Sequence, residues 1–145
     1  MPIRRHHRWL YPIDWRELSM VIRFKRAQGR CEGCGRPHGR LVIHLGGGRW
    51  WDAERGAWRD GEGRVLRRTV PNAGGLLMQA RTTRVVLATA HRDHDPTHNR
   101  PRNLAALCQR CHILHDKAEH LRRRRLTYLA RRALGDLFTG PYPTV

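Results

Sequence analysis

Four cysteines occur as two C-x-x-C pairs, Cys31–Cys34 and Cys108–Cys111. A C-x-x-C turn can direct two thiolates at one ion, and two such turns complete a tetrahedral zinc site. Glycines in the first pair and after it suit a tight turn, because glycine adopts positive φ at little cost. Two disulfides are the alternative, but they require an oxidising compartment, of which the sequence gives no sign. We therefore predict a structural zinc ion, Zn²⁺, that joins distant parts of the chain.

A second group of polar residues lies between positions 90 and 112, where the sequence reads AHRDHDPTHNRPRNL and then, from position 107, LCQRCH. A loop so rich in His, Asp and Asn is costly to hold rigid unless it binds something. His98 and Asn99 suit turn geometry, since asparagine readily adopts left-handed conformations. His91 follows an apolar segment and His112 opens a helical pattern, so zinc binding would hold both histidines on one small β-β-α unit.

Helices and strands that could position these residues are visible in the hydrophobic pattern. The alternation over 83–90 predicts a strand, Leu104–Leu107 predicts a second one, and a long helix follows from Gln109 or Cys111 to about Leu137. Asp14 and Glu17 have capping-box spacing, which predicts a helix over about 15–28 that Gly29 ends.

The segment 41–82 predicts an inserted β meander. Short strands are expected in four places, 41–45, 49–52, 57–59 and 64–68, and a loop at 71–75. Asp60-Gly61 between two of them is a hairpin signal. Trp50, Trp51 and Trp58 either pack across the strands or stack on nucleic-acid bases. DNA positioning and scaffolding are equal alternatives for the role of this segment.

The composition points to a polyanionic partner. The chain has 145 residues, 29 Lys+Arg against 12 Asp+Glu and a formal net charge of +17. Nearly all of the positive charge is arginine; a GC-rich genome explains arginine over lysine, but not the shortage of acids. Such a field attracts nucleic acid. No apolar run approaches the roughly 20 residues that cross a bilayer, and the start lacks the apolar stretch of a secretory signal, so we expect a soluble, cytoplasmic protein without a membrane partner.

Residues 90–112, with C-x-x-C-G at 31–35, resemble the HNH endonuclease family. The family pattern H-H-x-D-x-N-P-x-N-N-x-P-x-N-L followed by L-C-x-x-C-H aligns without gaps in this stretch. The resemblance covers about 31–40 and 83–118. It implies an α+β fold: a ββα-metal finger with a four-cysteine zinc site, an N-terminal helix, the inserted β meander and a long C-terminal helix. The expected domains are a basic arm at 1–13, an HNH nuclease domain at 14–138 and a tail at 139–145.

The resemblance also implies a reaction, the metal-dependent hydrolysis of phosphodiester bonds in DNA. His91 corresponds to the general base that takes a proton from the attacking water. Asn103 corresponds to the asparagine that hydrogen-bonds the loop and orients this histidine. His112 corresponds to a ligand of the catalytic ion, Mg²⁺ or another divalent cation. The zinc ligands of the family correspond to Cys31, Cys34, Cys108 and Cys111.

One position departs from the family pattern. Ala90 stands where the family usually places Asp or His as the first ligand of the catalytic ion, and alanine cannot bind a metal. Asp93 is the first substitute and His94 the second. In another alignment Asp93 and His94 become the ligand–base pair, but the preceding strand and the spacing from His91 to Asn103 then no longer fit. Ala90 also favours an alternative function, a catalytically inert, zinc-stapled nucleic-acid-binding module. A third hypothesis is a zinc-stapled protein partner within a larger assembly.

Arginines near the histidine loop and on the long helix are the expected nucleic-acid contacts: Arg92, Arg100, Arg102, Arg122 and Arg123. The run at 122–125 covers the whole circumference of a helix, so some of its members must point away from any one partner. A solvated helix is the alternative. The resemblance implies a phage-encoded or mobile-element nuclease in a bacterial host, acting beside a DNA-packaging or other DNA-processing complex.

Overall fold

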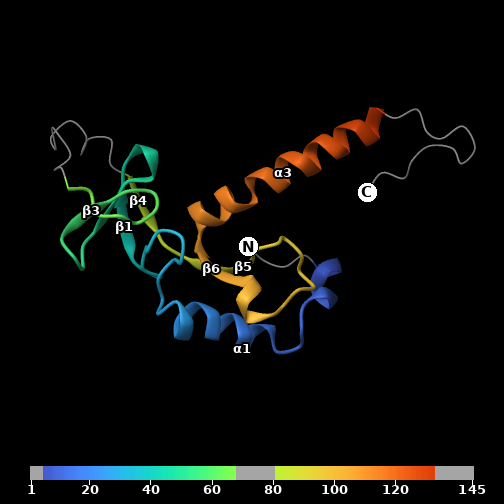
Figure 1. The fold of residues 1–145 in the computed structure, drawn as a ribbon, viewed down its shortest axis with the longest axis horizontal. Helices are drawn as coiled ribbons and strands as arrows, with labels where there is room; N and C mark the ends of the chain where they lie inside the picture. Colours follow the sequence, from blue (N-terminus) through green and yellow to red (C-terminus); the bar gives the residue numbers. More distant parts are fainter. Residues whose placement is uncertain (1–4, 68–80, 133–145) are drawn as a thin grey trace, which may run out of the picture. The chain divides into compact units, whose positions relative to one another are not determined.

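The computed structural model describes residues 5–67 and 81–132, which form a mixed α+β fold with two antiparallel sheets (Figure 1). The chain divides into two compact units, Met1–His112 and Ile113–Val145. The loop predicted at 71–75, the helix beyond 132 and the tail at 139–145 lie outside the described residues. None of the helices in the described ranges has the length and apolar character needed to span a membrane.

The N-terminal helix begins where the sequence predicts it. Helix α1 (Trp15–Met20) continues as a π-helical segment over Val21–Arg26, two residues short of the predicted end. The predicted capping box is wrong, because the Asp14 side chain makes no cap hydrogen bond and its backbone has φ −90° and ψ 18°. Its backbone carbonyl instead accepts the amide of Leu18 at 3.0 Å.

Two positive-φ residues end this helix and lead to the first cysteine pair. Gln28 and Gly29 have φ of 50° and 69°, so the predicted role of Gly29 as the helix stop is confirmed. The buried face of the helix centres on Ile22, which packs with Leu104 and Ala106 in a small core cluster.

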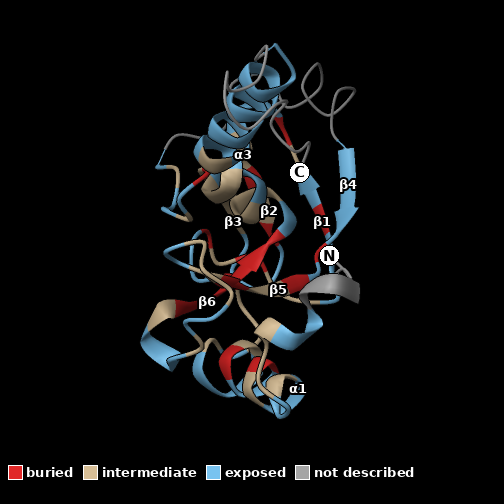
Figure 2. Cartoon of the chain, turned by 90° about the vertical axis from the view of Figure 1, so that its right-hand side faces the viewer, coloured by how far each residue is buried: buried red, intermediate tan, exposed pale blue. Residues whose placement is uncertain are grey.

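A two-stranded antiparallel sheet carries the candidate site. Strand β5 (Leu87–His91) pairs with β6 (Leu104–Cys108), in a register that runs from Leu87 opposite Cys108 to His91 opposite Leu104. Every residue of β6 is buried, and Figure 2 shows buried residues gathered on these two strands. The second predicted strand, 104–107, is therefore confirmed.

The strand predicted over 83–90 is divided between two sheets. Strand β4 (Arg81–Arg84) belongs to the inserted sheet, and β5 starts three residues later. At the break, Val85 donates to the carbonyl of Arg40 at 2.9 Å and accepts from the amide of Gly39 at 2.7 Å. These bonds join Val85 to the residues just before strand β1 (Leu41–His44), so the apolar alternation of the sequence continues although the chain passes from one sheet to the other.

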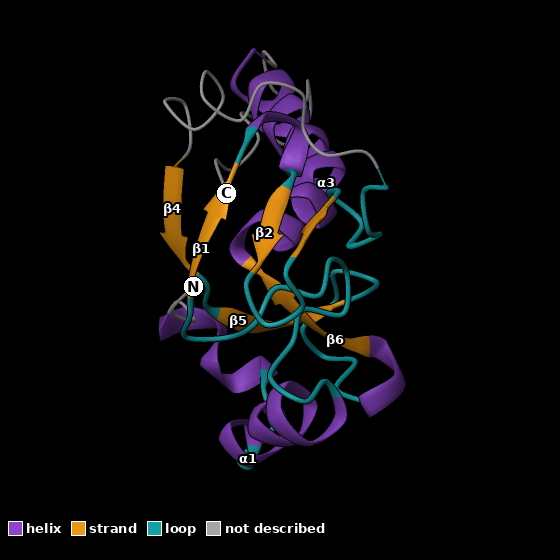
Figure 3. Cartoon of the chain, turned by 90° about the vertical axis from the view of Figure 1, so that its left-hand side faces the viewer, coloured by secondary structure: helices purple, strands orange, loops and turns teal. Residues whose placement is uncertain are grey.

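The inserted segment forms a four-stranded antiparallel sheet in the order β3-β2-β1-β4 (Figure 3). Its first three strands are β1 (Leu41–His44), β2 (Trp50–Asp52) and β3 (Ala57–Arg59). The strand predicted at 64–68 is reduced to one bridge, between Arg59 and Val65.

The tryptophans of this sheet pack across its strands. Trp50 is completely buried in the main core. Trp51 and Trp58 face each other in the register, with ring centroids 5.6 Å apart. The packing alternative thus accounts for all three side chains.

Candidate functional site

The four cysteines come together at the junction of β6 and α3 (Gln109–Arg132). Cys108 ends β6, Cys111 lies in the first turn of α3, and Cys31 and Cys34 approach from the turn after the N-terminal helix. Their sulfur atoms all lie within 4.8 Å of one another, and none is in a disulfide. The arrangement fits a single zinc ion with four thiolate ligands and contradicts the two-disulfide alternative.

The turn at Cys31 is built by backbone hydrogen bonds. The amide of Gly35 donates to the carbonyl of Cys31 at 2.7 Å, and the amide of Cys31 donates to the carbonyl of Arg36 at 3.0 Å. Gly35 has φ of +76°, as the glycine pattern predicts. From the other side, the Cys108 amide donates to Cys31 Sγ at 3.2 Å. An N–H donor favours the thiolate form that a metal requires.

The electrostatics of the cluster also favour a cation. Hydrogen bonds from the thiols of Cys111, Cys31 and Cys34 hold the pKa of Cys108 far below its ordinary value, whereas hydrogen bonding to Cys108 raises the pKa of Cys34 and of Cys111. Cys31, Cys34 and Cys108 are each no more than 3% exposed. Buried thiolates need a compensating charge, and four sulfur ligands leave no open coordination position. Zinc in this cluster would be structural.

Glu32, which the sequence analysis did not single out, attaches the first cysteine pair to β6. Its amide donates to the carbonyl of Ala106 at 2.8 Å, and its carboxylate accepts the Ala106 amide at 2.7 Å. Arg26 donates to both carboxylate oxygens, at 3.0 and 2.7 Å. Burial opposes ionisation of Glu32, but these hydrogen bonds outweigh it and lower its pKa. Glu32 thus takes both backbone hydrogen bonds of Ala106 on the edge of β6 that does not pair with β5. A local sequence pattern cannot predict this contact, because the two residues lie far apart in the chain.

A turn next to the inserted sheet packs against the cysteine cluster. A Cβ at Gly63 would lie 2.7 Å from the carbonyl oxygen of Cys34, so the turn before it packs directly on the first cysteine pair. Arg59 donates to the carbonyl of Gly63 at 2.6 Å, and Arg110 donates to that of Gly61 at 3.1 Å. These contacts support the scaffold alternative for this face of the insertion.

His91 lies at the end of β5 in an aromatic setting. Its ring stacks on Trp15, with centroids 5.4 Å apart and an interplanar angle of 8°, and meets the edge of Tyr11 at 5.8 Å. The Nε2 atom of His91 lies 2.9 Å from Oδ1 of Asn99. The Nδ2 atom of Asn99 donates to the carbonyl of Pro96 at 3.0 Å, which fixes the amide so that its oxygen faces the ring. This network assigns the proton of a neutral His91 to Nε2 and makes Nδ1 its basic atom.

Asn103 fixes the loop, as the resemblance implies, but its side chain is bonded elsewhere than to His91. Its amide donates to Asp93 Oδ1 and to the carbonyl of His98, both at 2.9 Å. Its backbone carbonyl accepts the amide of Arg92 at 2.7 Å, next to His91. The amide that contacts the histidine ring belongs to Asn99, which the sequence analysis assigned to turn geometry alone.

Asp93 is engaged in the same loop. Besides Asn103, its carboxylate accepts the amide of Asp95 at 2.9 Å and Nδ1 of His98 at 2.7 Å. The bonds from Asn103, the Asp95 amide and His98 hold the pKa of Asp93 well below its usual range. Hydrogen bonding to Asp93 in turn raises the pKa of His98. Through these bonds Asp93 fixes the conformation of the loop.

The remaining expected site residues are distributed as follows. Ala90 is buried opposite Ala105 on β6. His112 is half-buried in the first turn of α3, directly after Cys111. The arginines of the loop are exposed: Arg92, Arg100 and Arg102. Those of the helix donate to Glu119, Arg122 at 2.8 and 3.0 Å and Arg123 at 2.7 Å.

The resemblance places ligands of the catalytic divalent ion at positions 90 and 112, and only one of these two residues can bind a metal. His112 can supply an imidazole nitrogen, and Ala90 supplies nothing. Asp93 could offer a carboxylate oxygen while keeping part of its hydrogen bonding, since an ionised carboxylate has about four lone-pair sites.

Comparison with known proteins adds no relative: no family model, curated protein or solved structure matches this chain.

Proposed function

We propose that the protein is a metal-dependent endonuclease of the HNH type that hydrolyses phosphodiester bonds in DNA. One observation carries the proposal: the HNH-like segment lies on an antiparallel hairpin, β5–β6, that runs into a helix, with the four-cysteine cluster at the junction. This is the order of elements that a ββα-metal finger requires. The net charge of +17 supports a polyanionic substrate.

In this proposal His91 is the general base. A neutral imidazole can accept a proton near pH 7. The Oδ1 atom of Asn99, 2.9 Å from Nε2, would hold the ring in position for this role. Trp15 and Tyr11 restrict the tilt of the ring.

His112, with Asp93 as second ligand, would hold a divalent ion, which when bound neutralises charge on the scissile phosphate. The loop bonds of Asn103 keep Asp93 ionised and in a fixed position. The zinc cluster holds the helix start, and with it His112, against β6.

A specific observation favours a second function, a zinc-stapled nucleic-acid-binding module without catalysis. Ala90 is buried in the core, with 3% of its surface exposed, and its side chain has no atom that binds a metal. This position therefore supplies no ligand to a catalytic ion.

Nicking of supercoiled plasmid by the zinc-loaded chain separates the two functions. Nicked circles that form only after addition of Mg²⁺ or Mn²⁺ support the nuclease. Retention of plasmid without cutting, with every divalent ion tried, contradicts the nuclease and supports the binding module.

A further inference from the structure

The second compact unit contains residues 113–132, the C-terminal part of α3. None of the α3 residues is buried, and its leucines are half-exposed: Leu121 is 54%, Leu126 52% and Leu129 50% exposed. In proteins most of the stability of a helix comes from tertiary packing of its apolar face, which these leucines lack within the described residues. The helix therefore gains stability when a partner covers it.

The positive charge of this segment indicates that its partner is a polyanion. Residues 121–132 contain six arginines and no acidic residue. A second copy of the helix would bring like charges together, which opposes pairing through the leucines. A polyanion removes that repulsion, and guanidinium groups bind phosphate oxygens in a bidentate manner.

The six arginines fall into two classes. Arg122 and Arg123 donate to Glu119, and Arg132 donates to the Tyr128 hydroxyl and lies 5.3 Å over its ring. The other three, Arg124, Arg125 and Arg131, have no ion pair or hydrogen bond within the described ranges. Hydrogen bonding to Glu119, or to Tyr128 for Arg132, leaves the first class less able to bind a phosphate.

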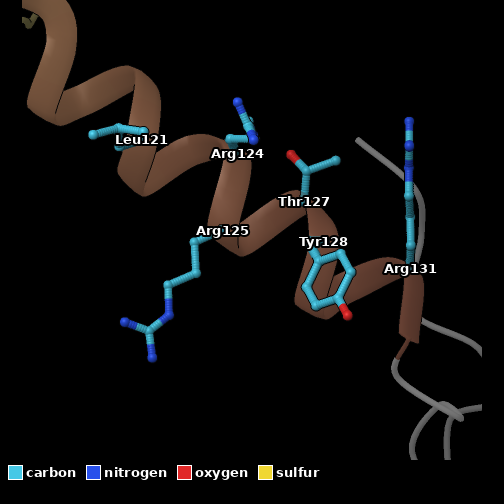
Figure 4. A pocket seen from close by; sticks show the side chains of 6 residues that line it. All are labelled: Leu121, Arg124, Arg125, Thr127, Tyr128 and Arg131. Atoms are coloured by element: carbon cyan, nitrogen blue, oxygen red, sulfur yellow. The ribbon is translucent and has the colours of Figure 1, made fainter.

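The unpaired arginines lie on two sides of the helix. Figure 4 shows Arg124, Thr127 and Arg131 projecting to one side and Arg125 to the other, around an open depression on the helix surface. Arg124 and Arg131 are two turns apart, about 10 Å along the axis. The major groove of B-DNA, about 12 Å wide, admits one α-helix between two phosphate backbones. Arg125 lies about 100° around the helix from Arg124, so the two side chains are directed at different walls of the groove.

We propose that residues 121–132 are a duplex-docking helix that lies in the major groove of DNA, with Arg124 and Arg131 on the phosphates of one strand and Arg125 on those of the other. The choice of DNA rests on the proposed function, whereas the docking itself requires no catalysis. The arrangement also explains an arginine run that surrounds the helix, since a groove contacts a helix on more than one side. Of the five arginines expected from sequence alone, the two on this helix, Arg122 and Arg123, become secondary contacts.

Two triple variants with equal loss of charge test the proposal. The first replaces the unpaired arginines by glutamine (Arg124→Gln, Arg125→Gln, Arg131→Gln). The second replaces the paired ones (Arg122→Gln, Arg123→Gln, Arg132→Gln). Both are made in the full zinc-loaded chain with His91→Ala, so that cleavage does not disturb binding. Glutamine keeps the helix propensity close to that of arginine.

Fluorescence anisotropy with a 25-base-pair duplex, between about 50 and 200 mM salt, gives the readout. We expect the unpaired variant to reduce the slope of log K against log salt by about 2.7, or 0.9 for each of three phosphates, and the paired variant by less than about 1. Equal losses in both variants would overturn the proposal, because net charge alone would then explain binding. Circular dichroism at 222 nm of each variant verifies that the helix is retained.

Two further ligands test the choice of partner. If the unpaired variant loses as much affinity for a single strand of the same length, docking in the major groove is wrong. If it loses as much affinity for polyglutamate, the helix recognises acidic protein. The nuclease proposal stands or falls separately, by plasmid nicking with the arginines intact.

Discussion

The Nε2 atom of His91 lies 2.9 Å from Oδ1 of Asn99, and the Asn99 amide is fixed from its other end by the carbonyl of Pro96. This relationship couples the conformation of the loop to the protonation of a single ring nitrogen. It also gives the site a positioning residue eight positions after the proposed base.

Asn99→Ala tests this coupling. Loss of the Oδ1 acceptor releases the tautomer of His91, and we expect plasmid nicking to slow by about 10- to 100-fold with little change in the KM for DNA. Nitrogen-15 NMR of the imidazole reports the tautomer without reference to activity. A neutral ring already protonated at Nδ1 in the unaltered protein would contradict the assignment.

Chelation tests the cysteine cluster. We expect one zinc ion per chain, and we expect its removal to unfold the Met1–His112 unit, because structural zinc sites of this kind contribute about 10 kcal/mol or more of apparent binding free energy. Metal analysis and thermal unfolding with and without chelator measure both. Cys34→Ser should reproduce the chelated state; an unchanged unfolding midpoint after complete loss of metal would show that the cluster does not support the fold.

Two glycines of the insertion allow the cost of backbone strain to be measured apart from the cost of a clash with the first cysteine pair. Gly63 and Gly56 both have positive φ, at 86° and 60°, but only at Gly63 would a Cβ meet the Cys34 carbonyl, while Gly56 has open space around it. Gly56→Ala should cost about 1 kcal/mol for the left-handed backbone. Gly63→Ala should cost about 2–4 kcal/mol, because overpacking adds to the same strain.

Thermal unfolding and the rate of zinc release measure both glycine variants. Equal destabilisation by the two variants would mean that the turn at Gly63 does not pack tightly against the backbone of Cys34.

Local patterns predicted the elements whose residues interact with near neighbours in sequence. The start of the N-terminal helix, β6, the first turn of α3 and the convergence of four cysteines all follow from periodicity or from ligand spacing. Features that depend on distant partners were missed. Val85 interrupts an alternating strand because Arg40 and Gly39 take its hydrogen bonds.

The candidate site shows the same division. The positions of His91 and His112 on a strand end and a helix start follow from the pattern. Glu32 and Asn99 could not be assigned, because their partners, Ala106 and His91, meet them only after the chain has folded back. The failure of Asp14 as a cap has another cause: its backbone adopts φ −90° and ψ 18°, outside the extended conformation of most N-caps.

In the proposed docking, Glu119 limits the charge that α3 presents to DNA. Glu119→Gln should release Arg122 and Arg123, which would raise DNA affinity and steepen the salt dependence by up to about 1.8 units of slope. Glu17→Gln in α1 is the matched control, since it removes the same charge from an exposed position. An equal gain from both variants would show that net charge, rather than release of the arginines, controls binding.

The same ion pairs predict a pH dependence. Hydrogen bonds from Arg122 and Arg123 lower the pKa of Glu119 to about 2. A depressed carboxyl pKa gives a stabilisation that is complete above the ordinary value, near 4.5, and is lost as the pH falls through about 2. The helical signal at 222 nm should therefore be larger in the unaltered protein than in Glu119→Gln at pH 6, and the two should converge about one pH unit below the pKa of Glu119. A difference of unchanged size at that pH would contradict the lowered pKa of Glu119.

The central claim, that His91 is the base of a nuclease, is tested most directly by the rate of plasmid nicking in Mn²⁺ for His91→Ala beside His120→Ala. Both variants lose one imidazole, and His120 is an exposed residue of α3 outside the proposed site. The account predicts that His91→Ala loses at least about 100-fold in rate while retaining DNA affinity, and that His120→Ala nicks at the unaltered rate. Equal nicking by both variants would contradict it.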